Sequence, residues 1–163
     1  MPTEIEKKFL LKNDNWRDQV KSSRNIRQGY LGSMAKASVR IRLDGDNANI
    51  NIKSADLAMV RQEYEYPVPV DQALEMLETL CESPQVDKIR HLVDYAGHTW
   101  EIDEFFGDNA GLVVAEIELN SEDEDFEIPE WLGEEVTDDG RYYNVNLVQN
   151  PYKNWAAGTS TVR

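Results

Sequence analysis

The sequence predicts a β-dominated α+β fold built from antiparallel strands, arranged either as an open sheet or as a closed barrel. Three observations support this class. About eight segments alternate apolar and polar residues with the period of two that a strand requires. Most of them follow one another after short, turn-like connections, which favours hairpins and therefore antiparallel pairing. Apolar residues at helical spacing occur in only a few places, which fits α+β architecture.

The first strand is expected over Thr3–Leu11, where the two faces differ in character. Successive strand side chains point to opposite sides of a sheet, so every second residue shares a face. One face is mainly apolar, with Lys7 as its exception. The charged residues of the other face are Glu4, Glu6 and Lys8. This face is ordinary if it meets water, but it becomes a binding surface if it turns inward.

Seven further strands are expected, and they repeat this two-faced pattern. Their ranges are Arg24–Leu31, Ala37–Leu43, Ala48–Lys53, Val60–Pro67, Gln85–Asp94, Thr99–Phe105 and Leu112–Leu119. The cluster Asp44-Gly45-Asp46-Asn47 separates two of these strands and is typical of a hairpin turn.

Helices are expected at three positions. A polar start at Asn13 leads into a short helix that runs to Val20. Asp71 is expected to cap a helix whose apolar residues recur at helical spacing until Pro84 closes the segment. A terminal helix is expected over Arg141–Gln149, with Pro151 as its stop.

The acidic charge of the chain is concentrated in one late stretch. The net charge is −14, and the segment Ser121–Asp139 holds ten acidic residues and no basic one. The remainder of the chain therefore carries a net charge of only −4. We expect the acidic stretch to be a solvated connection, and we expect no nucleic acid polymer as a partner, because a phosphate backbone needs basic contacts.

Length and cysteine content suggest a single domain over residues 1–163 in a reducing compartment. This length suits one domain with a substantial core. The single cysteine, Cys81, excludes an intramolecular disulfide and predicts a cytoplasmic location. No apolar segment is long enough to span a bilayer, and the start of the chain resembles neither a signal nor a transit peptide. We therefore expect no membrane partner, and the sequence is compatible with a homodimer.

The polar faces of the expected strands carry both acids and bases. The charged residues of these faces are the acids Glu4, Glu6, Glu63, Glu65, Glu101, Asp103, Glu116 and Glu118 and the bases Lys8, Arg40, Arg42, Lys53, Arg61, Lys88 and Arg90. On an open sheet they would simply be solvated. In a closed sheet they would line a lumen, where bases suit phosphate oxygens and carboxylates suit Mg²⁺ or Mn²⁺. The second arrangement describes a site for a metal-bound polyphosphate.

These charged residues also carry a family resemblance. Glu4-x-Glu6-x-Lys8 resembles the ExExK signature of the CYTH superfamily, the triphosphate tunnel metalloenzymes. The likeness continues through Arg40-x-Arg42, Lys53, Glu63-x-Glu65, Lys88-x-Arg90, Asp103 and Glu116-x-Glu118, and through the segments Trp131-Leu132-Gly133-x-Glu135-Val136-Thr137 and Arg141-Tyr142-x-Asn144. It covers essentially the whole chain and is greatest with the compact bacterial inorganic triphosphatases.

The resemblance implies a closed eight-stranded antiparallel barrel with a charged lumen, a few flanking helices and a small-molecule triphosphate bound inside on Mg²⁺ or Mn²⁺. Phosphate contacts are expected from Lys8, Arg40, Arg42, Lys53, Lys88 and Arg90. Metal ligands are expected among Glu4, Glu6, Glu63, Glu65, Asp103, Glu116 and Glu118. A catalytic pair of Tyr30 and Lys53 is expected near the reacting phosphate. Arg61 and Glu101 fit the inward face but receive no family role.

The expected activity is metal-dependent hydrolysis of inorganic tripolyphosphate or of a small organic triphosphate. Two alternatives stay open at the level of sequence. A class IV-type adenylate cyclase would convert ATP to cyclic AMP and pyrophosphate, and it would need a base pocket that we do not identify. A non-catalytic module would only bind polyphosphate or nucleotide, and such a module has little use for so many carboxylates.

Overall fold

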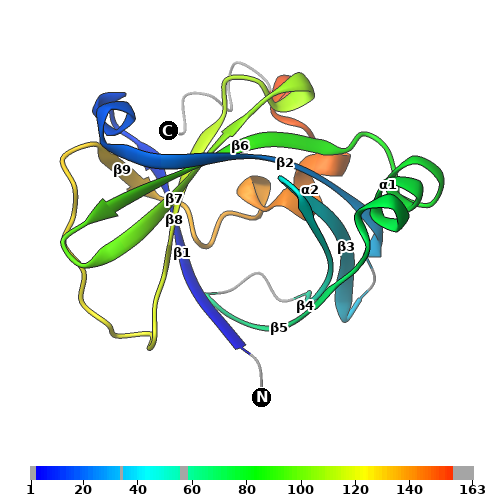
Figure 1. Ribbon diagram of the computed structural model, residues 1–163. Helices are drawn as coiled ribbons and strands as arrows, with labels where there is room; N and C mark the ends of the chain where they lie inside the picture. Colours follow the sequence, from blue (N-terminus) through cyan, green and yellow to red (C-terminus); the bar gives the residue numbers. More distant parts are fainter. Residues whose placement is uncertain (1–2, 34, 56–58, 156–163) are drawn as a thin grey trace.

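The computed structural model describes residues 3–33, 35–55 and 59–155, and its strands are arranged around one axis (Figure 1). Within these ranges the sheet has nine strands, and every pairing between them is antiparallel. The strands are β1 (Thr3–Leu11), β2 (Val20–Ser33), β3 (Ala37–Asp44), β4 (Asn47–Ser54), β5 (Val60–Pro67), β6 (Val86–Tyr95), β7 (His98–Phe105), β8 (Val113–Glu118) and β9 (Leu132–Glu135).

Eight of these strands form a closed barrel, as the sequence predicts. Their order is β5-β4-β3-β2-β6-β7-β8-β1, and β1 pairs again with β5 to complete the ring. The closing contact is short and joins the start of β1 to the start of β5, with Glu4 opposite Arg61. Closure removes the exposed edges that an open sheet would have.

The ninth strand is a feature that the sequence did not indicate. One edge of β1 pairs with β8 over Glu6–Leu10, while the other edge pairs first with β5 and then with β9. β9 lies inside the stretch that we expected to be a solvated connection, and that expectation is wrong for this part. The indole of Trp131 and the side chain of Leu132 are buried in the core, because this burial outweighs the polarity of the flanking acids.

The helices surround the barrel, with α1 against its outer face and α2 across one end of its interior. They are α1 (Val70–Thr79), α2 (Asn144–Gln149) and the 3-10 helices η1 (Asn15–Gln19), η2 (Gly107–Asn109), η3 (Gly140–Tyr142) and η4 (Tyr152–Asn154). The expected cap at Asp71 is wrong, since Pro69 precedes the helix and Asp71 lies in its first turn. There its carboxylate favours the positive end of the helix dipole instead. The expected terminal helix is split into η3 and α2.

Most of the apolar core lies between the barrel wall and the covering elements, and one cluster fills an end of the barrel interior. Trp16, Trp100 and Trp131 are fully buried in one cluster over β1, β6, β7 and β8. A second cluster lies inside one end of the barrel, under α2, because Val86 and Val114 share the inward strand faces of Lys88 and Glu116. A third cluster lies under α1. Along most of the barrel the apolar strand faces point outward and the charged faces point inward, whereas one end of the interior is apolar. None of the helices among the described residues has the length and apolar character of a membrane span.

Candidate active site inside the barrel

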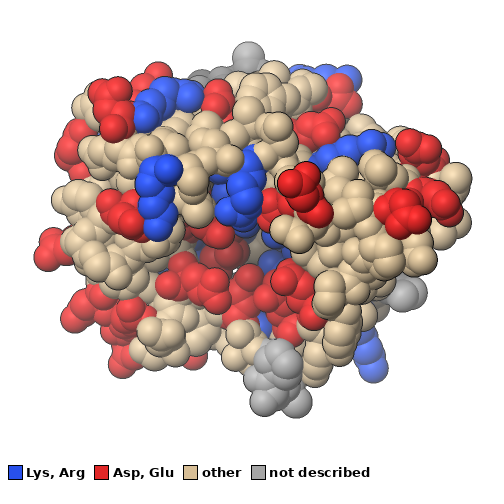
Figure 2. Space-filling view, in the orientation of Figure 1, with Lys and Arg blue, Asp and Glu red and all other residues tan. Residues whose placement is uncertain are grey.

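A polar cavity of about 300 Å³ occupies the inside of the barrel. Figure 2 shows a hollow on the molecular surface with acidic side chains around it and basic side chains within it. Of the site residues expected from the sequence, those that line the cavity are Glu4, Glu6, Lys8, Tyr30, Arg40, Arg42, Lys53, Glu63, Glu65, Lys88, Arg90, Glu116 and Glu118. Asp103 does not border the cavity. Arg61 and Glu101, which had no expected role, also line it.

The strand register explains why these side chains converge. Lys8 of β1 lies directly opposite Glu116 of β8, and Lys53 of β4 lies opposite Glu63 of β5. Residues opposite one another in an antiparallel pair point to the same face of the sheet. Because the sheet is closed, that common face becomes the inside of the barrel.

Asp103 is placed behind two cations. Its carboxylate accepts hydrogen bonds from Lys88 Nζ at 2.7 Å, from Arg90 Nε at 2.8 Å and from Arg90 Nη2 at 2.9 Å. Burial by itself would raise the pKa of Asp103, but Arg90 and Lys88 outweigh burial and hold it well below its ordinary value. Burial lowers the pKa of Lys88 to about 7, against the attraction of Asp103. Asp103 thus orients two phosphate-binding candidates, and its expected role as a metal ligand stays a prediction.

Two arginines face the cavity without a compensating carboxylate. Among the described residues, neither Arg40 nor Arg42 forms an ion pair. Arg40 is 6% exposed and its Nε has no hydrogen-bond partner. Arg42 Nε donates to the neutral amide oxygen of Gln28 at 3.0 Å. Burial, together with the charges of Arg40 and Arg90, lowers the pKa of Arg42 to about 10. A buried cation without a partner is costly, so this part of the cavity favours an anion.

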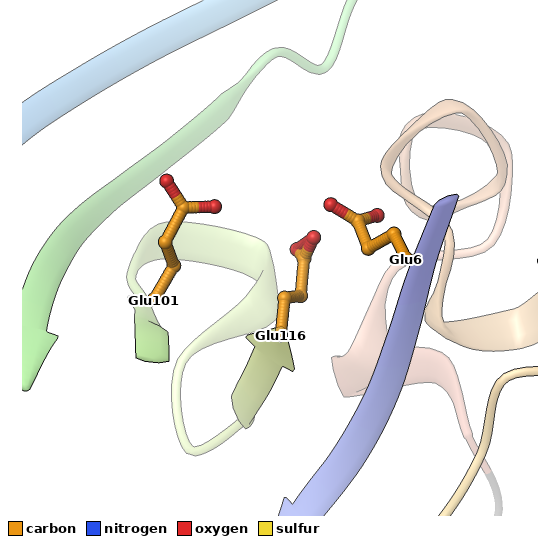
Figure 3. A group of neighbouring side chains, drawn as sticks. All are labelled: Glu6, Glu101 and Glu116. Atoms are coloured by element: carbon orange, nitrogen blue, oxygen red, sulfur yellow. The ribbon is translucent and has the colours of Figure 1, made fainter. Parts of the chain in front are cut away.

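Three glutamates on neighbouring strands form the opposite kind of group. One carboxylate oxygen from each of Glu6, Glu101 and Glu116 lies within 4.8 Å of the other two. Figure 3 shows these side chains rising from β1, β7 and β8 toward a common point. Oxygen ligands at such spacing match the demand of a hard divalent cation. Glu101 is the member whose role the sequence did not indicate.

This carboxylate cluster holds a proton when no cation is bound. Burial, followed by the charge of Glu116, raises the pKa of Glu6 to about 8. Burial would also raise the pKa of Glu116, but Lys8 and a hydrogen bond from Glu6 hold it well below its ordinary value. Lys8 Nζ lies 3.4 Å from Glu6 and 3.3 Å from Glu116. The pair therefore shares one negative charge, as closely spaced carboxylates do.

The remaining acids form a more open group at another part of the cavity. Lys53 Nζ donates to Glu4 at 2.9 Å and lies 3.6 Å from Glu63. Asn51 Nδ2 donates to Glu63 at 2.9 Å and to Glu65 at 3.3 Å. Burial, and then the charges of neighbouring acids, raise the pKa of Glu118. These four acids line the cavity but do not join the close cluster of Glu6, Glu101 and Glu116.

The expected catalytic pair does not form a direct contact here. Tyr30 is buried and packs in the cluster under α2, and it lies opposite Arg40 in the register of β2 and β3. Lys53 is held by Glu4 and Glu63. No hydrogen bond joins Tyr30 to Lys53 within the described part of the chain. Both side chains border the same cavity, so a shared role stays a prediction.

Gln28 behind the cavity, and Tyr143 and Asn144 at its lining, are among the residues for which the sequence predicted no role. Gln28 is fully buried and contacts Arg42, while Tyr143 and Asn144 bring the start of α2 to the cavity. The Tyr143 ring lies 4.7 Å from Lys8 Nζ, and its hydroxyl donates to the carbonyl of Thr137 at 2.7 Å. The only signal for these residues in the sequence was the family-like segment Arg141-Tyr142-x-Asn144. Their side chains are neutral, so they add nothing to a pattern of charges.

Comparison with known proteins gives consistent matches over nearly the whole chain. The family model for the CYTH domain matches residues 2–149. A protein named inorganic triphosphatase from Acetivibrio thermocellus is 47% identical over 155 residues, covering 95% of this chain and 99% of that protein. An inorganic triphosphatase from Nitrosomonas europaea is 38% identical over 151 residues, covering 89% and 96%.

A solved structure agrees with these sequence matches. The crystal structure of the inorganic triphosphatase NE1496 superposes with a TM-score of 0.66 at 37% identity, covering 91% of this chain and 95% of that one. The barrel, its charged interior and the family match over most of the chain lead to one conclusion. The chain belongs to the CYTH domain family.

Proposed function

We propose that this chain is a divalent-metal-dependent triphosphatase that hydrolyses inorganic tripolyphosphate, or a small organic triphosphate, inside its barrel. One observation carries the proposal: the cavity presents the unpaired arginines Arg40 and Arg42 together with the carboxylate cluster of Glu6, Glu101 and Glu116. A simple anion receptor would not bury such acids beside its ligand. Relatives named inorganic triphosphatase support the same activity.

The basic residues would bind the phosphates. Arg40 and Arg42 offer guanidinium groups that are not neutralised by the protein, and such groups bind phosphate oxygens in a forked geometry. Lys88 and Arg90 are held in place from behind by Asp103. Lys8 and Lys53 are the remaining candidates for phosphate contact, and both would exchange part of their carboxylate contacts for phosphate. Together these cations would offset the charge that develops on the leaving phosphate.

The acidic residues fit a divalent cation. Glu6, Glu101 and Glu116 would hold Mg²⁺ or Mn²⁺, because their oxygens are close enough to share one ion. When bound, the ion would polarise the phosphoryl oxygens and neutralise their charge. The more open acids Glu4, Glu63, Glu65 and Glu118 would position the attacking water or contribute further ligands. Tyr30 and Lys53 are proposed to assist proton transfer.

Product analysis tests this proposal directly. The protein would be incubated with tripolyphosphate, ATP or thiamine triphosphate, each with Mg²⁺, Mn²⁺ or EDTA, and the products would be resolved by ion chromatography. We expect phosphate and pyrophosphate from tripolyphosphate with either metal, and none with EDTA. Cyclic AMP from ATP would favour a cyclase instead. Tight binding without any turnover would favour a non-catalytic module.

Arg40→Met separates the binding role of this arginine from a role in stability. The Michaelis constant for tripolyphosphate should rise at least about tenfold, because a charge-assisted hydrogen bond contributes roughly 1.5–3 kcal/mol. The free energy of unfolding should stay the same or increase, since the substitution removes a buried cation beside Arg42. Steady-state kinetics and urea unfolding measure the two effects.

Arg17→Met is the matched control. Arg17 also forms hydrogen bonds through its guanidinium, to Glu104 at 3.2 and 3.3 Å, but it lies on the outer surface. Its removal should leave the Michaelis constant unchanged. A similar Michaelis constant in wild type and Arg40→Met would contradict the assignment of Arg40 to phosphate binding.

A further inference from the structure

A continuous chain of hydrogen bonds joins two cations of the cavity through two neutral amides. Arg42 Nε donates to Gln28 Oε1 at 3.0 Å, and Gln28 Nε2 donates to Asn144 Oδ1 at 2.8 Å. Lys88 Nζ donates to the same Asn144 oxygen at 3.1 Å. We call the side chains of Gln28 and Asn144 the amide bridge. It connects β3 and β6, on either side of β2, with the first residue of α2.

The donors and acceptors of the bridge fit in one orientation. Arginine and lysine can only donate, so each must meet an amide oxygen. Gln28 therefore turns its oxygen to Arg42, which leaves its NH₂ group to donate to Asn144. The Asn144 oxygen then accepts from both Gln28 and Lys88. Gln28 is fully buried, so a reversed amide would leave buried donors facing one another.

The bridge is neutral at a place where most other contacts are ionic. Lys8, Lys53, Lys88 and Arg90 all pair with carboxylates. A carboxylate at position 28 could also accept from Arg42, but it would cancel the positive charge of the guanidinium. An amide fixes the direction of the group and leaves its net charge available to an anion.

The bridge also links the cavity to the apolar cluster at one end of the barrel. α2 begins at Asn144, and one turn later Leu147 and Val148 are buried in the cluster that contains Tyr30. Because these apolar contacts hold α2 against the barrel, the position of the Asn144 amide is fixed from outside the cavity. A group that is held before ligand arrives loses little freedom on binding.

We propose that Gln28 and Asn144 are positioning residues, which hold Arg42 and Lys88 in a ligand-ready arrangement without neutralising them. The inference rests on the proposed function, in that the ligand held by these cations is a triphosphate. Two uncharged side chains would thus contribute to the affinity for the triphosphate. Through α2, they would also contribute to the docking of the C-terminal part of the chain.

The test compares five proteins with wild type. Binding of tripolyphosphate is measured by titration calorimetry in EDTA, together with the Michaelis constant and kcat in Mg²⁺ and the free energy of unfolding in urea. The variants are Gln28→Met, Gln28→Glu, Asn144→Leu, the double variant Gln28→Met/Asn144→Leu, and Gln85→Met. Gln85 is the matched control, because its Oε1 accepts from Arg27 Nε at 3.0 Å outside the cavity.

Gln28→Met and Asn144→Leu should each raise the dissociation constant about tenfold, the size expected for losing one hydrogen bond to a charged group. The double variant should raise it by clearly less than the product, because the bridge acts as one unit. Gln28→Glu should raise it more than Gln28→Met does, although the glutamate still accepts from Arg42. The increase should appear in the Michaelis constant, with kcat within a few-fold of wild type.

Several outcomes would overturn the inference. A purely structural role predicts that Gln28→Met lowers the free energy of unfolding and leaves the dissociation constant unchanged. Wild-type affinity in Gln28→Glu would also contradict it, as would an equal loss of affinity in Gln85→Met. If wild type binds tripolyphosphate without releasing phosphate, the proposed function fails while the binding series still decides the role of the bridge. If wild type binds no tripolyphosphate, both proposals fail.

Discussion

Glu6 illustrates how its surroundings change the chemistry of one side chain. It shares a face with Lys8 on β1, and inside the barrel its carboxylate lies close to those of Glu101 on β7 and Glu116 on β8. Its carboxyl cannot ionise freely beside Glu116, so in the absence of a cation it keeps its proton to about pH 8. A divalent cation would replace that proton, which makes metal binding and pH interdependent at this residue.

Glu6 gives a prediction for stability without metal. Between its ordinary pKa of 4.5 and about 8, the native state keeps a proton that the unfolded chain has lost. Stability must therefore fall as the pH rises through this window. Urea unfolding in EDTA at pH 5, 6 and 7 should show a decreasing free energy of unfolding for wild type. Glu6→Gln, which keeps the shape and the hydrogen bond without the titration, should remove most of this slope.

Other titratable groups limit the pH range over which the slope of the free energy of unfolding reports on Glu6. Asp103 and Glu116 have lowered pKa values, so their contribution is lost only as the pH falls below about 4. Lys88 has a lowered pKa of about 7, so it adds stability as the pH rises above that value. An equal slope in wild type and Glu6→Gln between pH 5 and 7 would show that Glu6 does not hold the proton.

Strand β1 is the element on which the barrel depends. It closes the ring by pairing with β5 and carries the first carboxylates and lysine of the cavity. Further along, after the pairing with β5 has ended, the same edge of β1 pairs with β9. Between these two partners, the Lys8 backbone N–H donates to Thr137 Oγ1 at 3.0 Å, and Lys8 O accepts from the N–H of Val136 at 2.8 Å. The segment after β9 thus satisfies the backbone of β1 where no strand lies beside it.

At Gly133 the backbone of β9 lies so close to that of β1 that no side chain fits between them. A Cβ at this position would lie 2.9 Å from the carbonyl oxygen of Leu10, which is closer than a real contact allows. Gly133→Ala should therefore lower the free energy of unfolding by about 1–3 kcal/mol, as a forced shift of packed backbone does. Gly32→Ala is the control, since a Cβ there meets nothing within 4 Å and stability should stay equal or rise slightly.

The sequence indicates the charged interior well, because the alternation of charged and apolar residues along a strand is a simple signal. Once Glu4, Glu6 and Lys8 share a face, closure of the sheet decides only whether that face looks inward. β9 gave no such signal, since its four residues lie in an acidic stretch and are recruited by the burial of Trp131 and Leu132. The sequence likewise did not indicate a role for Gln28, because a neutral amide on a strand is ordinary until its two hydrogen-bond partners are known.

At the scale of the whole molecule, the barrel has its charges inside and most of its apolar residues outside, with one apolar cluster under α2 at an end of the interior. The apolar clusters supply the stability, whereas the cavity concentrates unpaired arginines and a protonated carboxylate pair. Both features oppose folding and are relieved by an anion and a cation, respectively. The ligand that suits this interior is therefore a metal complex of a polyanion, and its binding should stabilise the fold.

Binding of the combined ligand should therefore raise the melting temperature strongly. At a free ligand concentration of 100 times the dissociation constant, binding adds about 2.7 kcal/mol. For a chain of this size each kcal/mol corresponds to roughly 2–4 °C, so Mg²⁺ with tripolyphosphate should raise the melting temperature by about 5–10 °C. Mg²⁺ alone or tripolyphosphate alone should give smaller shifts, because each relieves only one of the two opposing charge groups. Arg40→Met should lose most of the shift while Arg17→Met retains it, and an equal shift with orthophosphate and Mg²⁺ would show that the cavity does not select a chain of phosphates.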